Sequence, residues 1–332
     1  MTEYNGVMVF GEVRDGRLAA ITTELLGCGR KLADELGQEV ICLLVGDEVS
    51  NLAQEAVSFG ADKVYVANDP LLKDYRTEAY ASVADKIARQ VMPRIILLGQ
   101  TDIGRDLGPR LAFRLETAVT TDCIDLAVDA DSKSLLGTKP VYGGNALAIY
   151  TGEKLPQMAT VRVKAMSPIE RDDSRQGEVI SVEAGLDPSS LRTEFVEKVT
   201  DEGEGVKLED VAVVVAGGRG MGGAEGFGQL GELARILKGA VGASRPPCDN
   251  GWAPAVNQIG LTGKIIAPDL YIAVAISGAS QHITGCAGAR TIVAINKDPE
   301  ANIFREASFG VVGDWKKILP PFTAKVKELM TG

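Results

Sequence analysis

Four segments in the C-terminal half place glycine, hydroxyl, amide or cationic residues directly after apolar, strand-like runs. The first, 216–223, follows Val211–Val215 and contains Arg219. A strand that runs through glycines into a helix exposes backbone N–H groups at the positive end of the helix dipole, which suits a phosphate or pyrophosphate. These glycines do not match G-x-G-x-x-G in its usual context, and glycines at such turns are often purely structural. The other three segments are Val241–Pro246, Gln258–Lys264 and Ser277–His282.

The single histidine, His282, limits the chemistry that the chain can carry out. One imidazole excludes a multi-histidine metal site and any mechanism that needs two imidazoles. Judged by itself, His282 is better explained as a helix-start histidine hydrogen-bonded to backbone. The cysteines are widely spaced with no C-x-x-C pair for zinc or an iron–sulfur cluster, so reduced, buried thiols are the simpler interpretation. They are Cys28, Cys42, Cys123, Cys248 and Cys286.

The elements that must position these residues alternate between strand-like and helix-like patterns. Such alternation implies a parallel sheet, and open parallel sheets bind ligands beyond the carboxyl ends of their strands. The four segments therefore stand where such a sheet would bind a ligand. Asn296 closes the last predicted strand, and Asp314-Trp315 ends the final apolar segment. The predicted strands of this half are Val211–Val215, Leu270–Ile276 and Thr291–Ile295, with a helix beginning near Glu225.

The N-terminal half shows the same alternation. Apolar residues at Ile21, Leu25, Cys28, Leu32 and Leu36 recur at steps of four and three, which places them on one helical face. The apolar runs before and after this helix have the continuity of buried strands, so a parallel sheet with helices on its faces is predicted. These runs are Gly6–Val13, Gln38–Gly46, Asp62–Asn68 and Arg94–Gln100.

The sequence pattern changes from Thr117 to Val163, where turn signals separate the apolar runs and leave no room for helices. This pattern predicts an antiparallel meander appended to the parallel core. Ser167–Asp210 carries much of the clustered charge and is interpreted as a partly ordered connection between domains. The predicted fold class is α/β: an N-terminal parallel-sheet, nucleotide-binding-like domain with an antiparallel extension, and a C-terminal Rossmann-like (doubly wound) domain. We place the domains at 1–205, including the linker 167–205, and 206–332.

Composition sets wider limits on function. A chain of 332 residues suggests two domains, and 45% apolar residues with 38 glycines fit an α/β protein with Gly-rich turns. A net charge of -10 without a visible basic face argues against a nucleic-acid partner. The N-terminus lacks the features of a signal or transit peptide, and no apolar run approaches the ~20 residues needed to cross a bilayer. We expect a cytoplasmic protein without membrane insertion.

Taken in order, five runs of the C-terminal half resemble the FAD domain of electron-transfer flavoprotein alpha subunits. The order is highly specific, and the resemblance continues through 301–304 and 310–314 and, more loosely, into the N-terminal half at 101–107. It implies a fold, a cofactor and partners that composition and periodicity do not establish. The five runs are Ser244–Pro246, Gln258–Lys264, Pro268–Ala273, Ser277–His282 and Ile292–Asp298.

The resemblance implies one FAD in this chain and assigns roles to residues whose chemistry is suitable. Arg219 would supply positive charge near the pyrophosphate. The adenosine end would lie near Asn296, Asp314 and Trp315. The pyrophosphate and ribityl chain would be held by Ser244, Ser277, Gly278, Ala279 and Gln281, with Ser280 in the same run.

The isoalloxazine ring would lie along 258–262 in the same comparison. The Thr262 hydroxyl would be near N5, His282 near the C2 carbonyl and Arg245 close to the ring. One-electron reduction places negative charge largely over N1 and the C2 carbonyl, which a fixed guanidinium and an imidazole donor would stabilise more than the oxidised ring. The residues along the ring are Gln258, Ile259, Gly260, Leu261 and Thr262.

The implied function is electron transfer rather than stand-alone catalysis. Family members pair with a beta subunit that carries AMP or, in electron-bifurcating members, a second FAD. Electrons would pass between a flavin dehydrogenase, such as an acyl-CoA dehydrogenase, and a membrane or soluble acceptor, and NADH:ferredoxin bifurcation in a complex stays open. Cys248 and Cys286 depart from the larger or unreactive apolar side chains expected at their positions.

Two other classes of protein share the α/β layout. A nicotinamide-dependent dehydrogenase should show the fingerprint strand, turn and helix followed by an acidic ribose contact. A non-catalytic nucleotide-binding scaffold would bind a nucleotide in the first half and leave the second half empty. Flavin absorbance, with release of FAD on denaturation, excludes both.

Overall fold

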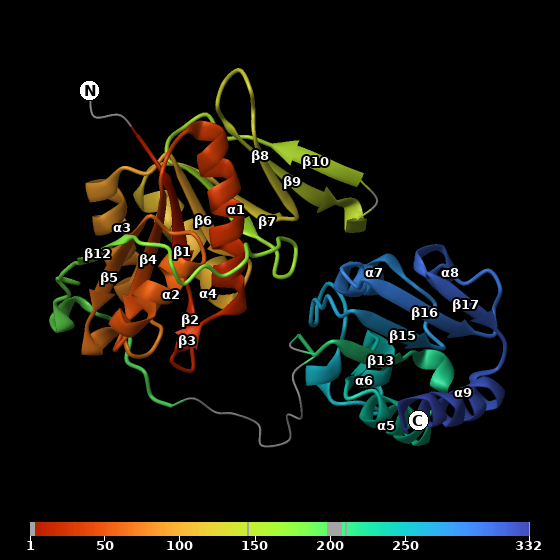
Figure 1. The fold of residues 1–332 in the computed structure, drawn as a ribbon. Coiled ribbons are helices and arrows are strands. Elements are labelled where there is room, and N and C mark those ends of the chain that lie inside the picture. Colours follow the sequence, from red (N-terminus) through yellow and green to blue (C-terminus); the bar gives the residue numbers. More distant parts are fainter. Residues whose placement is uncertain (1–3, 145, 198–207, 210, 332) are drawn as a thin grey trace. The chain divides into compact units, whose positions relative to one another are not determined.

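The computed structural model describes residues 4–144, 146–197, 208–209 and 211–331. The chain divides into two compact units, Met1–Glu197 and Lys198–Gly332, each built on a parallel sheet with helices on its faces (Figure 1). The predicted α/β class with two parallel sheets is therefore confirmed. The predicted domain boundary at 205/206 lies outside the described residues and stays a prediction.

A seven-stranded sheet forms the centre of the N-terminal unit, and every strand in it is parallel to its neighbours. Side chains alternate between the two faces, so Val7 and Val9 enter one apolar core and Met8 and Phe10 the other. In spatial order the strands are β12 (Glu178–Ser181), β5 (Lys63–Asn68), β4 (Val40–Gly46), β1 (Val7–Gly11), β6 (Ile95–Gly99), β11 (Gln157–Val161) and β7 (Val119–Cys123).

Helices cover both faces of this sheet. The predicted apolar stripe from Ile21 to Leu36 is confirmed as the inner face of α1, with Leu36 only partly buried against the same core. Helices α1 (Ala20–Leu36) and α2 (Ala53–Ser58) pack into the first core, and α3 (Thr77–Val91) and α4 (Asp102–Arg114) into the second. A small hairpin of β2 (Val13–Arg14) and β3 (Arg17–Leu18) follows β1.

The antiparallel meander predicted over Thr117–Val163 is right only in its middle. Strands β7 and β11, at its two ends, join the main sheet in parallel, with β11 between β6 and β7. Turn signals predict pairing between neighbours in sequence, but they carry no information about a run that pairs with a distant strand. The separate antiparallel sheet contains β8 (Asp125–Val128), β9 (Leu135–Val141) and β10 (Ala146–Tyr150).

The connection predicted over Ser167–Asp210 contains a strand that its sequence did not reveal. Strand β12 pairs in parallel with β5 and extends the N-terminal sheet by one strand. Its side chains are mostly exposed, so the sequence shows no apolar run at this place. The residues up to Glu197 belong to the N-terminal unit.

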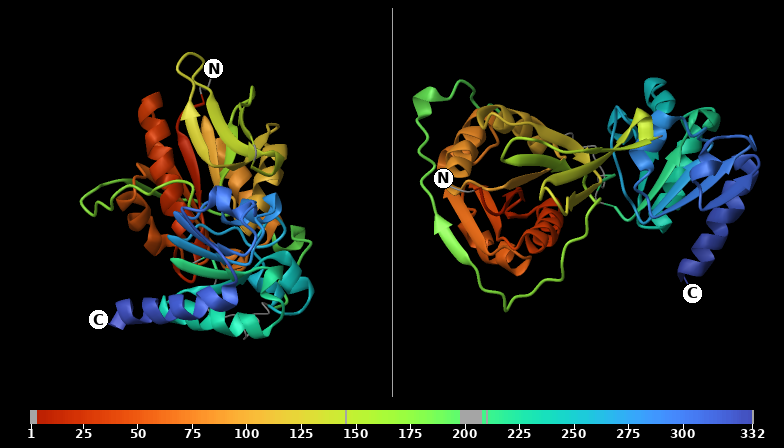
Figure 2. Two further views of the ribbon diagram at one scale, coloured as in Figure 1. Left: turned by 90° about the vertical axis from the view of Figure 1, so that its right-hand side faces the viewer. Right: turned by 90° about the horizontal axis from the view of Figure 1, so that it is seen from above.

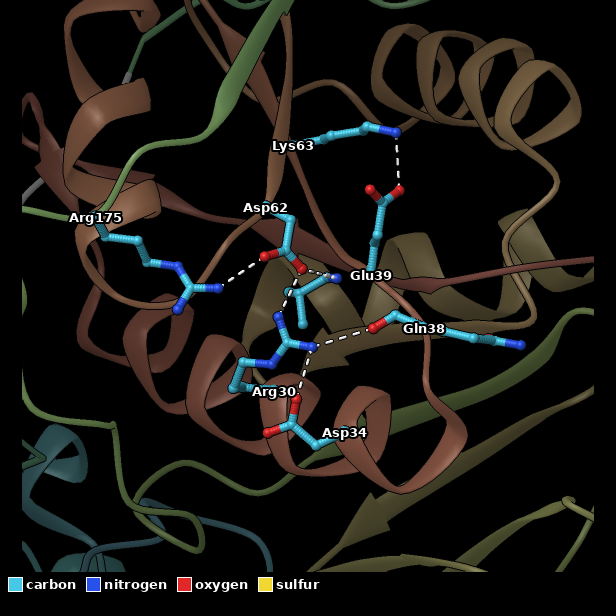
Figure 3. Close-up of polar contacts among 8 residues, drawn as sticks. Arg30, Asp34, Gln38, Glu39, Asp62, Lys63 and Arg175 are labelled. Atoms are coloured by element: carbon cyan, nitrogen blue, oxygen red, sulfur yellow. Dashed lines mark hydrogen bonds and ion pairs between the residues drawn. The ribbon is translucent and has the colours of Figure 1, made fainter.

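Hydrogen bonds to the Asp62 carboxylate link this connection to the sheet (Figure 3). Its Oδ1 accepts a hydrogen bond from Arg175 Nη2 at 2.7 Å, ahead of β12. Its Oδ2 accepts from Arg30 Nη1 of α1 at 2.6 Å and from the Val40 N–H at 2.8 Å. Burial alone would raise the pKa of Asp62, but these donors together lower it. One carboxylate thus joins a helix, a strand and the connection.

The C-terminal unit has a five-stranded sheet that is also fully parallel. In spatial order its strands are β14 (Ala240–Ala243), β13 (Val213–Gly217), β15 (Leu270–Val274), β16 (Thr291–Asn296) and β17 (Phe309–Val312). Helices α7 (Ser280–Cys286) and α8 (Ile303–Glu306) pack into one core, and α5 (Glu225–Ile236) and α9 (Trp315–Thr331) lie together in the other (Figure 2).

The last helix was not predicted from the sequence. Pro320 and Pro321 lie inside α9, and proline normally ends a helix. Trp315, expected to end the final apolar segment, instead begins this helix. No helix in the described ranges combines the length and the apolarity that crossing a membrane requires.

Replacing Asp62 by asparagine should lower the free energy of unfolding by about 1–3 kcal/mol, because two partly buried guanidinium groups lose their carboxylate. A lowered pKa means that this stabilisation is present above the ordinary aspartate pKa and is lost as pH falls through the folded-state value. Urea unfolding at neutral and at acidic pH measures the difference between the variant and the wild type.

Asp34→Asn is the matched control, because Asp34 also pairs with Arg30 but its side chain is 67% exposed. Its loss should stay below about 0.5 kcal/mol. Equal effects of the two substitutions would contradict the role assigned to Asp62.

Candidate functional site

The carboxyl ends of the parallel strands bring the polar segments of the C-terminal unit to one edge of the sheet (Figure 1). The spatial order β14-β13-β15-β16-β17 means that the chain leaves β13 on one side to form β14 and then crosses to β15. In open sheets of this kind the ligand binds outside the carboxyl ends where the order reverses, here between β13 and β15. Arg219 follows β13, Ser244 follows β14 and Ser277 follows β15.

Backbone from β13 and β15 meets closely at this point of reversal. Gly218 N–H donates to the Val274 carbonyl at 2.9 Å, and a Cβ on Gly218 would lie 2.1 Å from the Ala275 carbonyl oxygen. Gly222 and Gly223 instead face open space before α5 begins. Arg219 is exposed among them. The glycine segment is therefore crowded at its start, at Gly217 and Gly218, and has open backbone at Gly222 and Gly223, with the exposed Arg219 between the two parts.

The end of β14 presents a buried serine and an exposed arginine. Ser244 is 8% exposed, and its N–H donates to the Gly217 carbonyl at 3.0 Å. Arg245 begins the short helix α6 (Arg245–Asp249), and its Nε donates to Asp249 Oδ2 at 3.2 Å. Both partners are largely exposed, so this ion pair does not hold the guanidinium strongly. Arg245 is thus a cation that can turn toward a ligand.

The end of β15 turns sharply into α7 through Gly278. This residue has φ of +80°, and a Cβ there would lie 2.2 Å from the Ile303 N atom, so any side chain would collide with backbone. Helix α7 begins without a side-chain cap. Exposed polar and small residues cover the turn and the first helical positions: Ser277, Ala279, Ser280 and Gln281.

The segment Gln258–Lys264 forms a loop held between β14 and α7. Ile259 N–H donates to the Ala243 carbonyl at 2.8 Å, and Leu261 N–H donates to the Gln281 carbonyl at 2.7 Å. Ile259 is buried, whereas Leu261 is 57% exposed. The loop therefore lies beside the first turn of α7 with its tip open to solvent.

Glycines allow this loop to approach α7 closely. A Cβ on Gly285 would lie 2.3 Å from the Gly260 N atom, and a Cβ on Gly260 would lie 2.9 Å from the Gln281 carbonyl oxygen. At the tip, Gln258 Nε2 donates to Thr262 Oγ1 at 3.0 Å. The hydroxyl and amide are therefore held together on the exposed side of the loop.

His282 is buried beneath this loop, with little exposure to solvent. It is 6% exposed, its Nδ1 is 3.0 Å from the Ile259 carbonyl oxygen, and its Nε2 is 2.7 Å from the Tyr271 hydroxyl. Burial lowers the pKa of His282 to about 4, which the Ile259 carbonyl offsets only in part. The sequence considered by itself suggested a histidine bonded to backbone, and that contact is present. Nothing in the sequence distinguishes Tyr271 from the other residues of a buried apolar strand.

Asn296 ends β16 and Trp315 begins α9, and both side chains make hydrogen bonds within the C-terminal unit. Asn296 Nδ2 donates to the Ile276 carbonyl at 2.8 Å, and its Oδ1 accepts from the Asp298 N–H at 3.0 Å. Trp315 Nε1 donates to the Gly220 carbonyl at 3.2 Å, beside the glycine segment. Asp314 is exposed, and its Oδ1 accepts from the Lys316 N–H at 3.0 Å. These residues shape the edge, and the Asp314 carboxylate faces solvent.

Cys248 and Cys286, the two cysteines that differ from the side chains expected from the resemblance, lack the lowered pKa of a reactive thiol. Burial raises the pKa of Cys286 to about 12. Burial, with a smaller contribution from Asp249, also raises the pKa of Cys248, despite the nearby Arg245. Both thiols therefore stay protonated near neutral pH.

A cavity of about 300 Å³ lies in the other unit, at the carboxyl ends of β1 and β4. Its lining includes four carboxylates and one lysine, so an anionic phosphate would be repelled there. The C-terminal edge, by contrast, offers exposed arginines, hydroxyls and open glycine backbone. The residues at that edge fit a long, phosphate-bearing ligand such as a dinucleotide. The cavity residues that carry charge are Glu12, Asp15, Asp47, Glu48 and Lys73.

Two family patterns match the chain. The electron transfer flavoprotein domain matches residues 7–187, and the electron transfer flavoprotein FAD-binding domain matches residues 207–287. The second match contains Arg219, Ser244, the Gly260 loop and the Ser277–His282 turn. The segments that follow β13, β14 and β15 thus fall within a domain defined by FAD binding, whereas Asn296, Asp314 and Trp315 lie outside the matched residues.

Full-length relatives agree with these matches. The chain is 46% identical over 330 residues to the electron transfer flavoprotein subunit alpha of Thermoanaerobacterium thermosaccharolyticum, covering 99% of this chain and 100% of that protein. It is 47% identical over 331 residues to the subunit alpha of Megasphaera elsdenii, covering 99% and 98%. It is 42% identical over 332 residues to Protein FixB of Clostridium saccharobutylicum, covering 100% and 99%.

Substituting Gly285 by alanine should weaken FAD binding at least tenfold, because the methyl group collides with Gly260 and displaces the loop. Titration of the flavin-free protein with FAD, followed by absorbance, measures the dissociation constant. Gly228→Ala is the control, since Gly228 lies in α5 of the same unit with open space around it. Unchanged affinity in the Gly285 variant would show that the loop contact does not shape the site.

Proposed function

The chain belongs to the family of electron transfer flavoprotein alpha subunits, and we propose that it holds its FAD along the carboxyl edge of the C-terminal sheet. The observation that carries this proposal is the convergence at one edge of segments that follow β13, β14 and β15. Bound FAD supplies the chemistry of accepting electrons from one protein and releasing them to another. This chain's own residues bind the cofactor, orient it and set how readily it takes an electron.

The phosphate-bearing middle of FAD fits the turns after the central strands. Arg219 brings positive charge beside open glycine backbone, and Gly278 allows backbone to approach where a side chain could not fit. The hydroxyls of Ser277 and Ser280 and the amide of Gln281 are exposed at the same turn and add donors. The adenosine end is assigned to Asn296, Asp314 and Trp315, where buried side chains shape the surface and one carboxylate is open.

The isoalloxazine ring is assigned to the Gly260 loop and Arg245. Thr262 and Gln258 form a hydrogen-bonded pair on the exposed side of the loop, and Leu261 offers an apolar surface. Arg245 is exposed at the adjacent strand end with only a weak ion pair. A guanidinium favours the electron-rich form of the ring because its charge attracts the added electron, so it raises the potential.

Pairing with a beta subunit follows from the family, and the identity of the partners beyond it is proposed. We place the chain between a flavin dehydrogenase, such as an acyl-CoA dehydrogenase, and an electron acceptor. The beta subunit is proposed to hold AMP or a second FAD. Counting flavin and AMP released from the purified heterodimer separates these cases, because two flavins per heterodimer would indicate a bifurcating complex and one flavin with AMP a simple carrier.

Removing the charge of Arg245 by alanine should lower the first one-electron potential of the bound flavin by roughly 40–120 mV. A unit charge several ångströms away at intermediate dielectric contributes about 1–3 kcal/mol, and 1.4 kcal/mol corresponds to about 59 mV. Spectroelectrochemistry of the heterodimer measures the potential. Arg245→Lys should recover part of the loss, because it restores charge without the planar guanidinium.

Arg290→Ala serves as the control for lost charge. Arg290 directly precedes β16, so it lies at the opposite, amino-terminal edge of the sheet. Its removal should leave the potential nearly unchanged. A potential unaffected by Arg245→Ala would overturn the assignment of the ring to this strand end.

A further inference from the structure

The side chain of Gln258 reaches from the base of the Gly260 loop to the hydroxyl at its tip. Its Nε2 donates a hydrogen bond to Thr262 Oγ1 at 3.0 Å. Gln258 is half-buried, whereas Thr262 is exposed. The exposed hydroxyl therefore has a hydrogen-bond partner within the protein before any ligand arrives.

We propose that Gln258 is a positioning residue that fixes the direction in which the Thr262 hydroxyl forms hydrogen bonds. Because the amide N–H donates to the hydroxyl oxygen, the O–H of Thr262 is left to donate to the ligand. Gln258 thus acts on FAD through Thr262 and without touching the ring, although the resemblance placed it along the ring. This inference rests on the proposed function.

Backbone hydrogen bonds hold Gln258 in place. Its carbonyl accepts from the Lys264 N–H at 2.7 Å, and its own N–H donates to the Ala255 carbonyl at 3.0 Å. The next residue, Ile259, donates to the carbonyl of Ala243, the last residue of β14. The amide side chain therefore extends from a backbone position that is fixed on both sides.

Gly263 leaves room for this side chain beside the turn that carries Thr262. A Cβ on Gly263 would lie 3.0 Å from Gln258 Cγ and 2.3 Å from the Gln258 carbonyl oxygen. The Gly263 N–H donates to the Gly260 carbonyl at 3.0 Å, which closes the turn. The Gln258 side chain therefore packs against the turn, within reach of the hydroxyl.

The direction of the hydrogen bond matters because a hydroxyl can either donate or accept. The polar edge of an oxidised flavin ring presents mainly acceptors, and one added electron makes these acceptors more negative. Full reduction instead turns a ring nitrogen into an N–H donor, which needs an acceptor. A hydroxyl held as a donor therefore stabilises the ring that carries one extra electron and opposes full reduction.

Gln258→Leu removes the amide and leaves the Thr262 hydroxyl free to turn and accept. Spectroelectrochemistry of the FAD-loaded heterodimer measures the first and the second one-electron potential. We expect the disproportionation constant of the bound flavin to rise about tenfold, so the gap between the two potentials narrows by about 59 mV. An unchanged gap would overturn the proposal.

A double variant shows whether the effect passes through the hydroxyl. Thr262→Val removes the hydroxyl and keeps the shape of the side chain. Adding Gln258→Leu to Thr262→Val should then change the disproportionation constant by less than about twofold, because no hydroxyl is left to orient. A full tenfold effect in the Thr262→Val background would show that Gln258 acts on the ring directly and would refute the positioning role.

The flavin-free heterodimer tests the direction of the hydrogen bond itself. In ¹⁵N-glutamine spectra the Gln258 signals are those missing from Gln258→Leu. We expect one Nε2 proton of Gln258 to exchange slowly with solvent, and Thr262→Val should abolish this protection. If the amide were turned over, the hydroxyl would donate to Oε1, and an unprotected Nε2 group would contradict the proposal.

Gln54→Leu is the matched control, because the Gln54 Nε2 also donates a hydrogen bond, to the Arg175 carbonyl at 3.2 Å, but in the N-terminal unit. It should leave both potentials unchanged. FAD uptake separates the two proposals. A heterodimer that takes up no FAD would overturn the proposed function and this inference with it, whereas normal uptake with an unchanged gap in Gln258→Leu would overturn this inference alone.

Discussion

The close approach of the Gly260 loop to helix α7 is the constraint on which the candidate site depends. Gly285 leaves no room for a side chain against Gly260, and the His282 ring beneath the loop bonds to the Ile259 carbonyl. Because the loop is fixed in this way, its exposed tip presents a paired hydroxyl and amide at a defined place beside the strand ends. Preorganised groups of this kind favour a charged ligand without reorganising when it arrives.

The parallel sheet supplies the rest of the site from the same edge. Gly218 lets the turn after β13 lie against the turn after β15, because a side chain there would collide with the Ala275 backbone. Gly278 likewise lets the turn after β15 lie against the backbone of Ile303, at the start of α8. Arg219 and Arg245 place positive charge at two of the strand ends. The acidic cavity of the N-terminal unit has a similar position relative to its own sheet but the opposite charge. The two units therefore have similar sheets, but the charge at the carboxyl ends of the strands differs in sign between them.

The sequence predicted those parts of the fold that leave a local pattern. The apolar runs from Val40 to Gly46 and from Leu270 to Val274 are strands, and the stripe that begins at Ile21 is a helix. It did not predict β12, whose exposed residues lack such a run, or the parallel pairing of β11, which depends on a distant partner. The candidate residues were found by resemblance and strand-end position, whereas Tyr271 carries no signal until the fold places its hydroxyl on His282.

The claim that the carboxyl edge of the C-terminal sheet holds the FAD is tested most directly by hydrogen exchange. Amide exchange in the heterodimer, measured by mass spectrometry with and without FAD, reports where the cofactor protects the backbone. Bound FAD should slow the exchange of backbone amides at 217–223, 244–249, 258–264 and 277–282. Protection at the carboxyl ends of β1 and β4 instead, with none in these four segments, would contradict it.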